Sequence, residues 1–256
     1  MNLVIVTGTT KGLGAALYAA LVNDQNNVVI AVSRGIGNSV DGDISERMGS
    51  LNAIIGADFG DVVSVELAFN RIALHLSDIG KHHFERAVLI NNAGVVLPVG
   101  AFDQIDGEGL KNNIHVNLIS PMVAMRRFAE LTRSIARQRL IINISSGAAK
   151  RAIAGWSAYC AAKAGLEMAA QVAALEAAAN DPTLAICALA PGVIDTPMQS
   201  QVRLASADAF PDVERFRAMK MDGMLRPADE VAHDIIRLMA SGKLTNGGSF
   251  DIRTLV

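Results

Sequence analysis

Short apolar runs alternate with longer amphipathic segments along most of the chain. The runs cover residues 3–6, 28–32, 52–57, 87–91, 140–144, 184–189 and 249–252, and the amphipathic segments cover 12–23, 61–77, 103–135, 156–179 and 227–240. Continuous apolar runs of this length are typical of strands in a parallel sheet that is covered on both faces. Their alternation with helices predicts right-handed βαβ units. We therefore expect an α/β fold, a Rossmann-type doubly wound parallel sheet of about seven strands with helices on both faces.

Two segments interrupt this pattern. Residues 34–51 are rich in glycine and polar side chains, which predicts a short or irregular crossover. Residues 195–226 contain Thr-Pro, Phe-Pro and Arg-Pro breaks between helical fragments. Because this insertion follows the carboxyl end of a predicted strand, it is predicted to form a lid over a ligand crevice. No linker or repeat divides the sequence, so residues 1–256 are expected to form a single domain.

The composition supports a large apolar core and argues against several classes of protein. Of the 256 residues, 51% are apolar and 19% are charged, which disfavours disorder. The net charge of -2 gives no basic excess for nucleic-acid binding. No run approaches the roughly 18 apolar residues of a membrane span. The two cysteines and the lack of a signal-peptide pattern favour a cytoplasmic protein.

A glycine-rich segment, Thr-Gly-Thr-Thr-Lys-Gly-Leu-Gly at residues 7–14, directly follows the first predicted strand and opens the first helix. Glycines at such a turn let the backbone approach a pyrophosphate, which binds at the helix N-terminus. The spacing is G-x-x-x-G-x-G, which differs from the common dinucleotide motif, and a glycine-rich turn alone is weak evidence. Its place between strand and helix favours cofactor binding. The predicted cofactor residues here are Gly8, Thr10, Lys11, Gly12, Leu13 and Gly14.

The end of the second predicted strand bears on the choice between NADP and NAD. An acidic residue at this place would bind the ribose 2′-hydroxyl of NAD, but the chain has Ser33 and Arg34 there. Arg34 and Lys11 can converge on a 2′-phosphate, although each could also be an ordinary surface residue. The missing acid and the two cations together favour NADPH over NADH. Asp58, after the third strand, can bind the adenine amino group, cap the next helix, or do both.

Tyr159 and Lys163 are four residues apart on a predicted helix, so they share one face. A nearby ammonium favours the phenolate and would bring the tyrosine pKa down from about 10. Such a pair is common by chance on helix surfaces, but Ser146 ends the fifth predicted strand, at the sheet edge where ligands bind. Its hydroxyl could hold a substrate carbonyl beside Tyr159. Trp156, on nearly the same face, is a candidate substrate residue that could equally be core.

The chain resembles the short-chain dehydrogenase/reductase family. The matching segments are the glycine loop, Asn-Asn-Ala-Gly at 91–94, His-Val-Asn at 115–117, Ser146, Tyr-Cys-Ala-Ala-Lys at 159–163 and Pro-Gly-Val-Ile-Asp-Thr at 191–196. They occur in family order and cover nearly the whole chain. Each segment alone is weak evidence, but the ordered set is specific.

The resemblance implies a role for each matching residue. Tyr159 would protonate the carbonyl oxygen, Lys163 would bind the nicotinamide ribose and lower the tyrosine pKa, and Ser146 would polarise the carbonyl. Asn117 would hold a water molecule that links Lys163 to solvent. Residues that would line the cofactor or anchor its carboxamide are Asn91, Ala93, Gly94, Pro191, Gly192, Ile194 and Thr196. In the lid, Met198 is a candidate substrate contact.

Within the family, segments 146–150, 155–160, 191–196 and 214–217 look like bacterial benzil reductases that form (S)-benzoin, which lie near the sepiapterin reductases. This resemblance implies NADPH-dependent reduction of an aryl ketone or a vicinal dicarbonyl compound. One alternative is a 3-oxoacyl-thioester reductase, which would need a basic patch such as Arg203, Arg215, Arg217 and Lys220 for an acyl carrier protein. Another is a non-catalytic NADP-binding sensor. We also expect a homodimer or homotetramer, and no metal site, because His82 and His83 have no ligand spacing around them.

Overall fold

The sheet of the computed structural model contains seven parallel strands in the order β3-β2-β1-β4-β5-β6-β7. The structure describes residues 1–34, 51–78 and 84–256. The strands are β1 Asn2–Thr7, β2 Asn27–Ser33, β3 Ala53–Gly56, β4 Phe84–Asn91, β5 Ala136–Ile144, β6 Leu184–Ala190 and β7 Ser249–Asp251. This sheet confirms the predicted doubly wound α/β fold.

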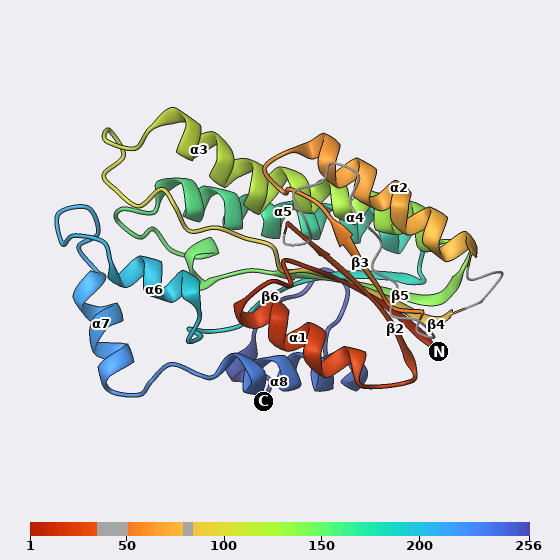
Figure 1. The fold of residues 1–256 in the computed structure, drawn as a ribbon. Coiled ribbons are helices and arrows are strands. Elements are labelled where there is room, and N and C mark those ends of the chain that lie inside the picture. The colour runs from red at the N-terminus through yellow and green to blue at the C-terminus, as the bar shows by residue number, and fades with distance from the viewer. Residues whose placement is uncertain (35–50, 79–83) are drawn as a thin grey trace.

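Helices cover both faces of the sheet (Figure 1). Helices α1 (Gly12–Val22) and α8 (Ala228–Ser241) lie on one face. Helices α2 (Val62–Asp78), α4 (Ser120–Thr132) and α5 (Ser157–Asn180) lie on the other. Helix α3 (Gly107–Ile114) continues through a π-helical turn at His115–Ile119 into α4. The three segments together form one long helical stretch where the pattern predicts a helix over 103–135.

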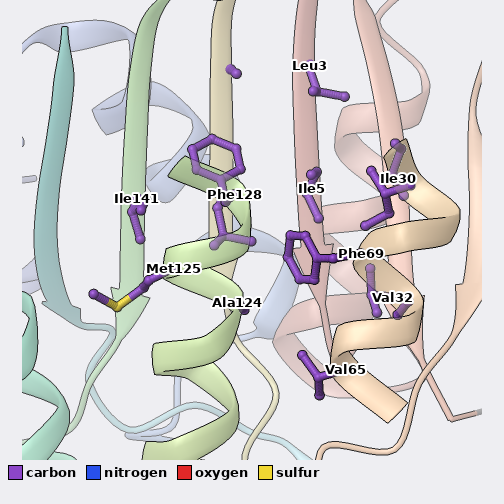
Figure 2. Packing of buried hydrophobic residues seen from close by; sticks show 14 of the residues in the cluster. Leu3, Ile5, Ile30, Val32, Val65, Phe69, Ala124, Met125, Phe128 and Ile141 are labelled. Atoms are coloured by element: carbon purple, nitrogen blue, oxygen red, sulfur yellow. The ribbon is translucent and has the colours of Figure 1, made fainter. Parts of the chain in front are cut away.

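Each face of the sheet has its own apolar core, because the continuous apolar strands bury side chains on both sides. On the face covered by α2 and α4, Phe69 and Phe128 pack against Leu3, Ile5 and Ile141 of the strands (Figure 2). All five side chains are at most 1% exposed. The opposite core joins strand residues to α1 and α8. This packing explains why the strands read as unbroken apolar runs.

The element boundaries differ from the predictions mainly at segment ends. The predicted helix at 103–135 begins at Gly107, where Asp106 accepts a hydrogen bond from the Gly109 N–H and caps the first turn. Strand β5 begins at Ala136, four residues before the predicted start, and its first residues Ala136–Gln138 are partly or fully exposed, so they lack the apolar signal of a buried strand. The crossover predicted at 34–51 lies almost wholly outside the described residues.

The chain reverses its direction of travel across the sheet at β1. Strands β2 and β3 lie on one side of β1, and β4 begins the series on the other side. In open α/β sheets, ligands bind at the carboxyl ends of the strands beside such a switch point. The segment predicted as a lid holds α6 (Pro197–Arg203) and α7 (Val213–Met221), which follow the carboxyl end of β6 (Figure 1). The fold therefore places the glycine loop, Ser146 and the lid around one crevice.

Candidate active site

The glycine loop packs so closely that two of its positions have no room for a side chain. A Cβ at Gly14 would overlap the carbonyl oxygen of Gly8 and lie 2.5 Å from Asn92 Nδ2. Gly8 has a φ of +74°, and a Cβ there would lie 2.8 Å from Ala93 Cα. The Asn92 amide donates to the carbonyls of Thr7 and Gly8 at 3.0 and 3.2 Å. Because Gly8 and Gly14 have no side chains, the backbone of the loop stays uncovered at these positions, as close approach of a pyrophosphate requires.

The N-terminus of α1 favours the binding of an anion. Its N-cap residue, Lys11, makes no side-chain hydrogen bond to the first turn, and that turn contains no acidic residue. The first N–H groups of a helix have no partner within the helix, and the helix dipole favours negative charge at this end. Together with the glycine cradle, this end of α1 fits the phosphates of a dinucleotide.

The same crevice also holds the two cations that are predicted to bind a 2′-phosphate. Arg34 follows β2 directly, Lys11 lies in the glycine loop, and both side chains are exposed and line the cavity. Asp58 also lines the cavity, and its Oδ1 accepts a hydrogen bond from the Gly60 N–H at 3.0 Å. Asp61 accepts from the Val63 N–H at the start of α2, so the capping of that helix belongs to Asp61.

Ser146, Tyr159 and Lys163 meet at the carboxyl end of β5. The side chain of Ser146 lies close enough to the Tyr159 hydroxyl to lower the pKa of Tyr159. Lys163 Nζ lies 5.9 Å from the centroid of the Tyr159 ring and donates to the Ile144 carbonyl at 2.8 Å. Tyr159 and Lys163 are 7% and 5% exposed. Residues that are thirteen and seventeen positions apart in sequence thus lie together at the strand end, with Tyr159 and Lys163 buried and Ser146 half-buried.

Burial shifts the acid–base properties of this pair in opposite directions. Burial raises the pKa of Tyr159, because the phenolate loses hydration, and the bond from Ser146 opposes this shift. Burial lowers the pKa of Lys163 to about 8, and the negative charge of Glu167 opposes that shift. The sequence predicts a lowered tyrosine pKa, but in this structure burial raises it. A neutral tyrosine is a proton donor, as reduction of a carbonyl requires.

Asn117 lies behind the pair, with its side chain fully engaged by protein groups. Its amide donates to the Val95 carbonyl at 2.8 Å and to Asn113 Oδ1 at 2.9 Å, and its Oδ1 accepts from the Val95 N–H at 3.1 Å. Asn117 sits in the π-helical turn, four residues before Pro121. Because proline has no N–H, the Asn117 carbonyl lacks the usual helical donor.

An aromatic cluster closes the other side of the cavity. The rings of Trp156 and Phe210 are stacked at 4.8 Å, and Phe216 lies 5.5 Å from Trp156. Trp156 also meets the Tyr159 ring edge to face at 5.4 Å. Phe210 and Phe216 come from the lid, and Met198 packs against the same cluster. Trp156, Phe216 and Met198 line the cavity, so this cluster forms an aromatic wall beside Tyr159.

A cavity of about 620 Å³ joins these parts, a size typical of cofactor and substrate sites. Three of the predicted residues, all in the described part of the chain, do not line it: Gly14, Asn91 and Asn117. The Asn91 amide instead donates to Asn143 Oδ1 at 2.9 Å between β4 and β5. The other predicted residues all line the cavity: Gly8, Thr10, Lys11, Gly12, Leu13, Ser33, Arg34, Asp58, Ala93, Gly94, Ser146, Trp156, Tyr159, Lys163, Pro191, Gly192, Ile194, Thr196 and Met198.

Several residues that shape the site are not among the individual residues predicted to bind cofactor or substrate. Asn92 braces the glycine loop, and Phe216 and Arg215 bring the lid into the cavity wall. The Asn-Asn-Ala-Gly segment could have drawn attention to Asn92, but the lid residues are separated from the motifs by irregular chain. Glu167 is buried next to Ser145 without lining the cavity, and only the fold reveals it.

The short chain dehydrogenase family model matches residues 2–207. The chain belongs to the short-chain dehydrogenase family. It is an oxidoreductase that acts on CH–OH or C=O groups with a nicotinamide cofactor. A benzil reductase, (S)-benzoin forming, from Bacillus cereus is 35% identical over 96% of this chain and 97% of its own length. The enzyme of that name from Bacillus subtilis is 32% identical over 99% of each chain, and sepiapterin reductase from Bos taurus is 27% identical over 98% of this chain and 94% of its own.

Solved structures of short-chain dehydrogenases share the fold. A short-chain dehydrogenase/reductase from Saccharomyces cerevisiae has a TM-score of 0.80 at 22% identity, covering 98% of this chain and 96% of its own. The aldohexose dehydrogenase of Thermoplasma acidophilum has a TM-score of 0.73 at 22% identity, with coverages of 98% and 91%. At these identities the likeness concerns the fold.

Neither a metal site nor a membrane span is found in the described segments of this dehydrogenase. Residues 1–34, 51–78 and 84–256 contain no group of three or more His, Cys, Asp or Glu side chains that could hold a metal ion. Within the same ranges, no helix combines the length and the apolar character needed to cross a membrane. His82 and His83 lie outside these ranges.

Proposed function

We propose that this chain is an NADPH-dependent carbonyl reductase in which Tyr159 donates the proton. The observation that carries the proposal is that Ser146 and the buried Tyr159 and Lys163 line one cavity together with the glycine loop. When bound, NADPH supplies the hydride that reduces the carbonyl carbon. The hydroxyls of Ser146 and Tyr159 hold the carbonyl oxygen, and Tyr159 transfers its proton to that oxygen to give the alcohol.

Lys163 has two tasks in this proposal. Its ammonium binds the nicotinamide ribose and stabilises the phenolate that Tyr159 becomes after proton transfer. The proton is then restored from solvent through Lys163. We propose that the Asn117 carbonyl, rather than its engaged amide, holds the water molecule of this relay, because Pro121 leaves that carbonyl without its helical donor.

The aromatic wall supports an aryl ketone or a vicinal dicarbonyl compound such as benzil as the substrate. Rings of the substrate can pack against Trp156 and Phe216 while one carbonyl reaches Tyr159. The benzil reductases among the relatives agree with this substrate class.

The alternative of a 3-oxoacyl-thioester reductase depends on a basic patch near the lid. Three of its four cations are engaged within the protein. Arg203 donates to the Ser200 hydroxyl at 2.9 Å. Lys220 Nζ lies 2.6 Å from Asp195 Oδ2, and Arg217 donates to the carbonyls of Arg203 and Ala205. The patch available to an acyl carrier protein is reduced accordingly, so the ketone reductase is favoured. The complete set of Ser146, Tyr159 and Lys163 likewise disfavours a non-catalytic sensor.

Replacement of Arg34 by Ala tests the choice of NADPH. We expect the Kd for NADPH to rise by roughly 10- to 100-fold, the effect of losing a charge-assisted hydrogen bond to the 2′-phosphate. The Kd for NADH should change little, because it lacks that phosphate. Arg137→Ala is a matched control, since Arg137 is an exposed arginine paired with Glu85 at the other end of the sheet. Equal weakening of both cofactors, measured by fluorescence titration, would rule out the proposed role.

We propose that the chain forms a homo-oligomer through α4 and α5. Met168, Val172 and Leu175 form a stripe at helical spacing on α5, with exposed fractions of 60, 46 and 74%. Met122 on α4 adds a further exposed apolar side chain at 45%. An exposed apolar stripe on a helix is typical of an interface between subunits. Light scattering should give at least a dimer, and a monomer would contradict this proposal.

We also propose a cytoplasmic location. Cys160 and Cys187 are both free thiols, and Cys187 is buried in β6. Free thiols are typical of reducing compartments. Fractionation of the source cells checks this location.

A further inference from the structure

Glu167 is a buried carboxylate beside the reactive pair. It lies on α5 one turn beyond Lys163 and two turns beyond Tyr159, so the three residues share one face of the helix. Glu167 is 7% exposed. Both of its carboxylate oxygens accept hydrogen bonds, Oε1 from the Ser145 hydroxyl at 2.5 Å and Oε2 from the Ser249 hydroxyl at 2.8 Å. Among the described residues, no arginine or lysine lies within ion-pair distance of it.

A carboxylate in such a place is costly for the fold. Burying a charge without an ion pair is unfavourable, and a neutral Gln of similar volume could bond to both hydroxyls, accepting from one and donating to the other. The position therefore calls for a role that needs the charge. The nearest one in the structure is the electrostatic effect of Glu167 on Lys163.

Glu167 and Lys163 hold consecutive residues at the end of β5. Lys163 binds the Ile144 carbonyl, and Glu167 binds the hydroxyl of Ser145, which directly precedes the catalytic Ser146. Through Ser249, the same carboxylate ties α5 to β7. The side chain of Glu167 thus fixes α5 against the strand end that carries Ser146.

Glu167 also opposes the effect of burial on Lys163. Burial lowers the pKa of Lys163 to about 8, and the negative charge of Glu167 raises it. A Cβ at Gly94 would lie 3.9 Å from Lys163 Nζ and 3.0 Å from Asn117 Oδ1, so these two side chains converge there. The groups that face Lys163 are Tyr159 and Glu167 on its own helix and, from other elements, the Ile144 carbonyl, the Gly94 backbone and the neutral Asn117 amide. Asp251 and Arg253, beyond Ser249, pair with each other.

We infer that Glu167 is a positioning residue for carbonyl reduction: its carboxylate keeps Lys163 protonated and holds Ser145, and through it the strand end that carries Ser146. The inference rests on the proposed function of Tyr159 and Lys163. It assigns to Glu167 an effect on the ionisation of Lys163, without contact to the substrate or the cofactor.

The test is the pH dependence of kcat/KM for ketone reduction in the wild type and in Glu167→Gln. The kcat/KM for ketone reduction should fall as the pH rises through about 8, because the protonated form of Lys163 is lost. Gln keeps the size of Glu and can still bond to both hydroxyls, one of which then accepts from the Gln amide, but it removes the charge. We expect the alkaline limb to move to lower pH by about one unit, which lowers kcat/KM at pH 8 roughly fivefold.

Two further variants separate charge from structure. Ser249→Ala removes one hydroxyl bond to Glu167 and leaves the carboxylate in place, so its alkaline limb should match the wild type. Glu167→Asp keeps the charge on a shorter side chain. Its pH profile should therefore retain the alkaline limb of the wild type, even if the melting temperature falls. The Asp variant also provides the test if the Gln variant does not fold, since a limb displaced to lower pH in Asp would overturn the inference.

The outcomes for Glu167 and for the proposed function can be told apart. An active wild type with the same alkaline limb in Glu167→Gln would reduce Glu167 to an anchor for Ser145 and Ser249 and leave the reductase proposal intact. A shift of equal size in Ser249→Ala would overturn the inference in the same way. A folded wild type that binds NADPH but reduces no ketone would overturn the proposed function, and the inference with it.

Discussion

Replacing Tyr159 by Phe is expected to abolish most ketone reduction while leaving NADPH binding close to that of the wild type. The substitution removes only the hydroxyl that lies beside Ser146 and that would protonate the carbonyl oxygen. Loss of a positioned general acid lowers the rate by roughly 100- to 10,000-fold. Initial rates of NADPH oxidation and a fluorescence titration of NADPH measure the two effects separately.

The only other tyrosine of the chain supplies a matched control. Tyr18 lies on α1 and packs against the core on the face opposite to α5. Tyr18→Phe makes the same chemical change, and its kcat should stay near the wild-type value. If Tyr159→Phe retained more than about a tenth of the wild-type rate, the proton would have to come from another group.

The second large effect is expected at Gly14, where Ala should weaken both NADPH binding and the fold. An added Cβ would overlap the Gly8 carbonyl and press on the Asn92 amide, so the glycine loop would have to move. Overpacking of this kind costs about 1–3 kcal/mol of folding free energy. Displacement of the cradle should raise the Kd for NADPH more than tenfold, measured by titration beside thermal unfolding.

Gly107→Ala is the control for this substitution. Gly107 begins α3, and a Cβ there meets nothing within 4 Å. Because alanine is the better helix former, the melting temperature should stay the same or rise slightly. Wild-type NADPH affinity in Gly14→Ala would show that the loop does not hold the cofactor as proposed.

The central strands of the sheet could be predicted from the sequence because they are buried on both faces. Strand β1 reads as Leu-Val-Ile-Val within Asn2–Thr7, and this continuous apolar pattern is distinct from the pattern of the amphipathic helices. Exposed ends carry no such signal. The first residues of β5, from Ala136 to Gln138, were missed for that reason.

The motif residues of the site were also accessible from sequence, because each sits at a strand end or on one helix face. Ser146 lies two residues after the end of β5, and Tyr159 and Lys163 follow the periodicity of α5. The directions of the pKa shifts of Tyr159 and Lys163 could not be predicted from the sequence. The spacing of Tyr159 and Lys163 predicts a lowered tyrosine pKa, but the degree of burial decides the direction, and burial depends on the lid and on the whole sheet.

The features of the site that could not be predicted depend on contacts between segments that are distant in sequence. Phe210 stacks on Trp156 across more than fifty residues, and Ser249 reaches Glu167 across more than eighty. No local pattern marks these pairs. The orientation of Asn91, away from the cavity and towards Asn143, also follows from the pairing of β4 with β5 rather than from its motif.

The most direct test of the account is a comparison of initial rates with three substrates and two cofactors. Benzil, a pteridine ketone and an acetoacetyl thioester would each be supplied with NADPH and with NADH. The account predicts the highest kcat/KM for benzil with NADPH, because the aromatic wall and the cations Arg34 and Lys11 act on the same reaction. Turnover confined to the acetoacetyl thioester, or NADPH binding without oxidation of any of the three, would contradict it.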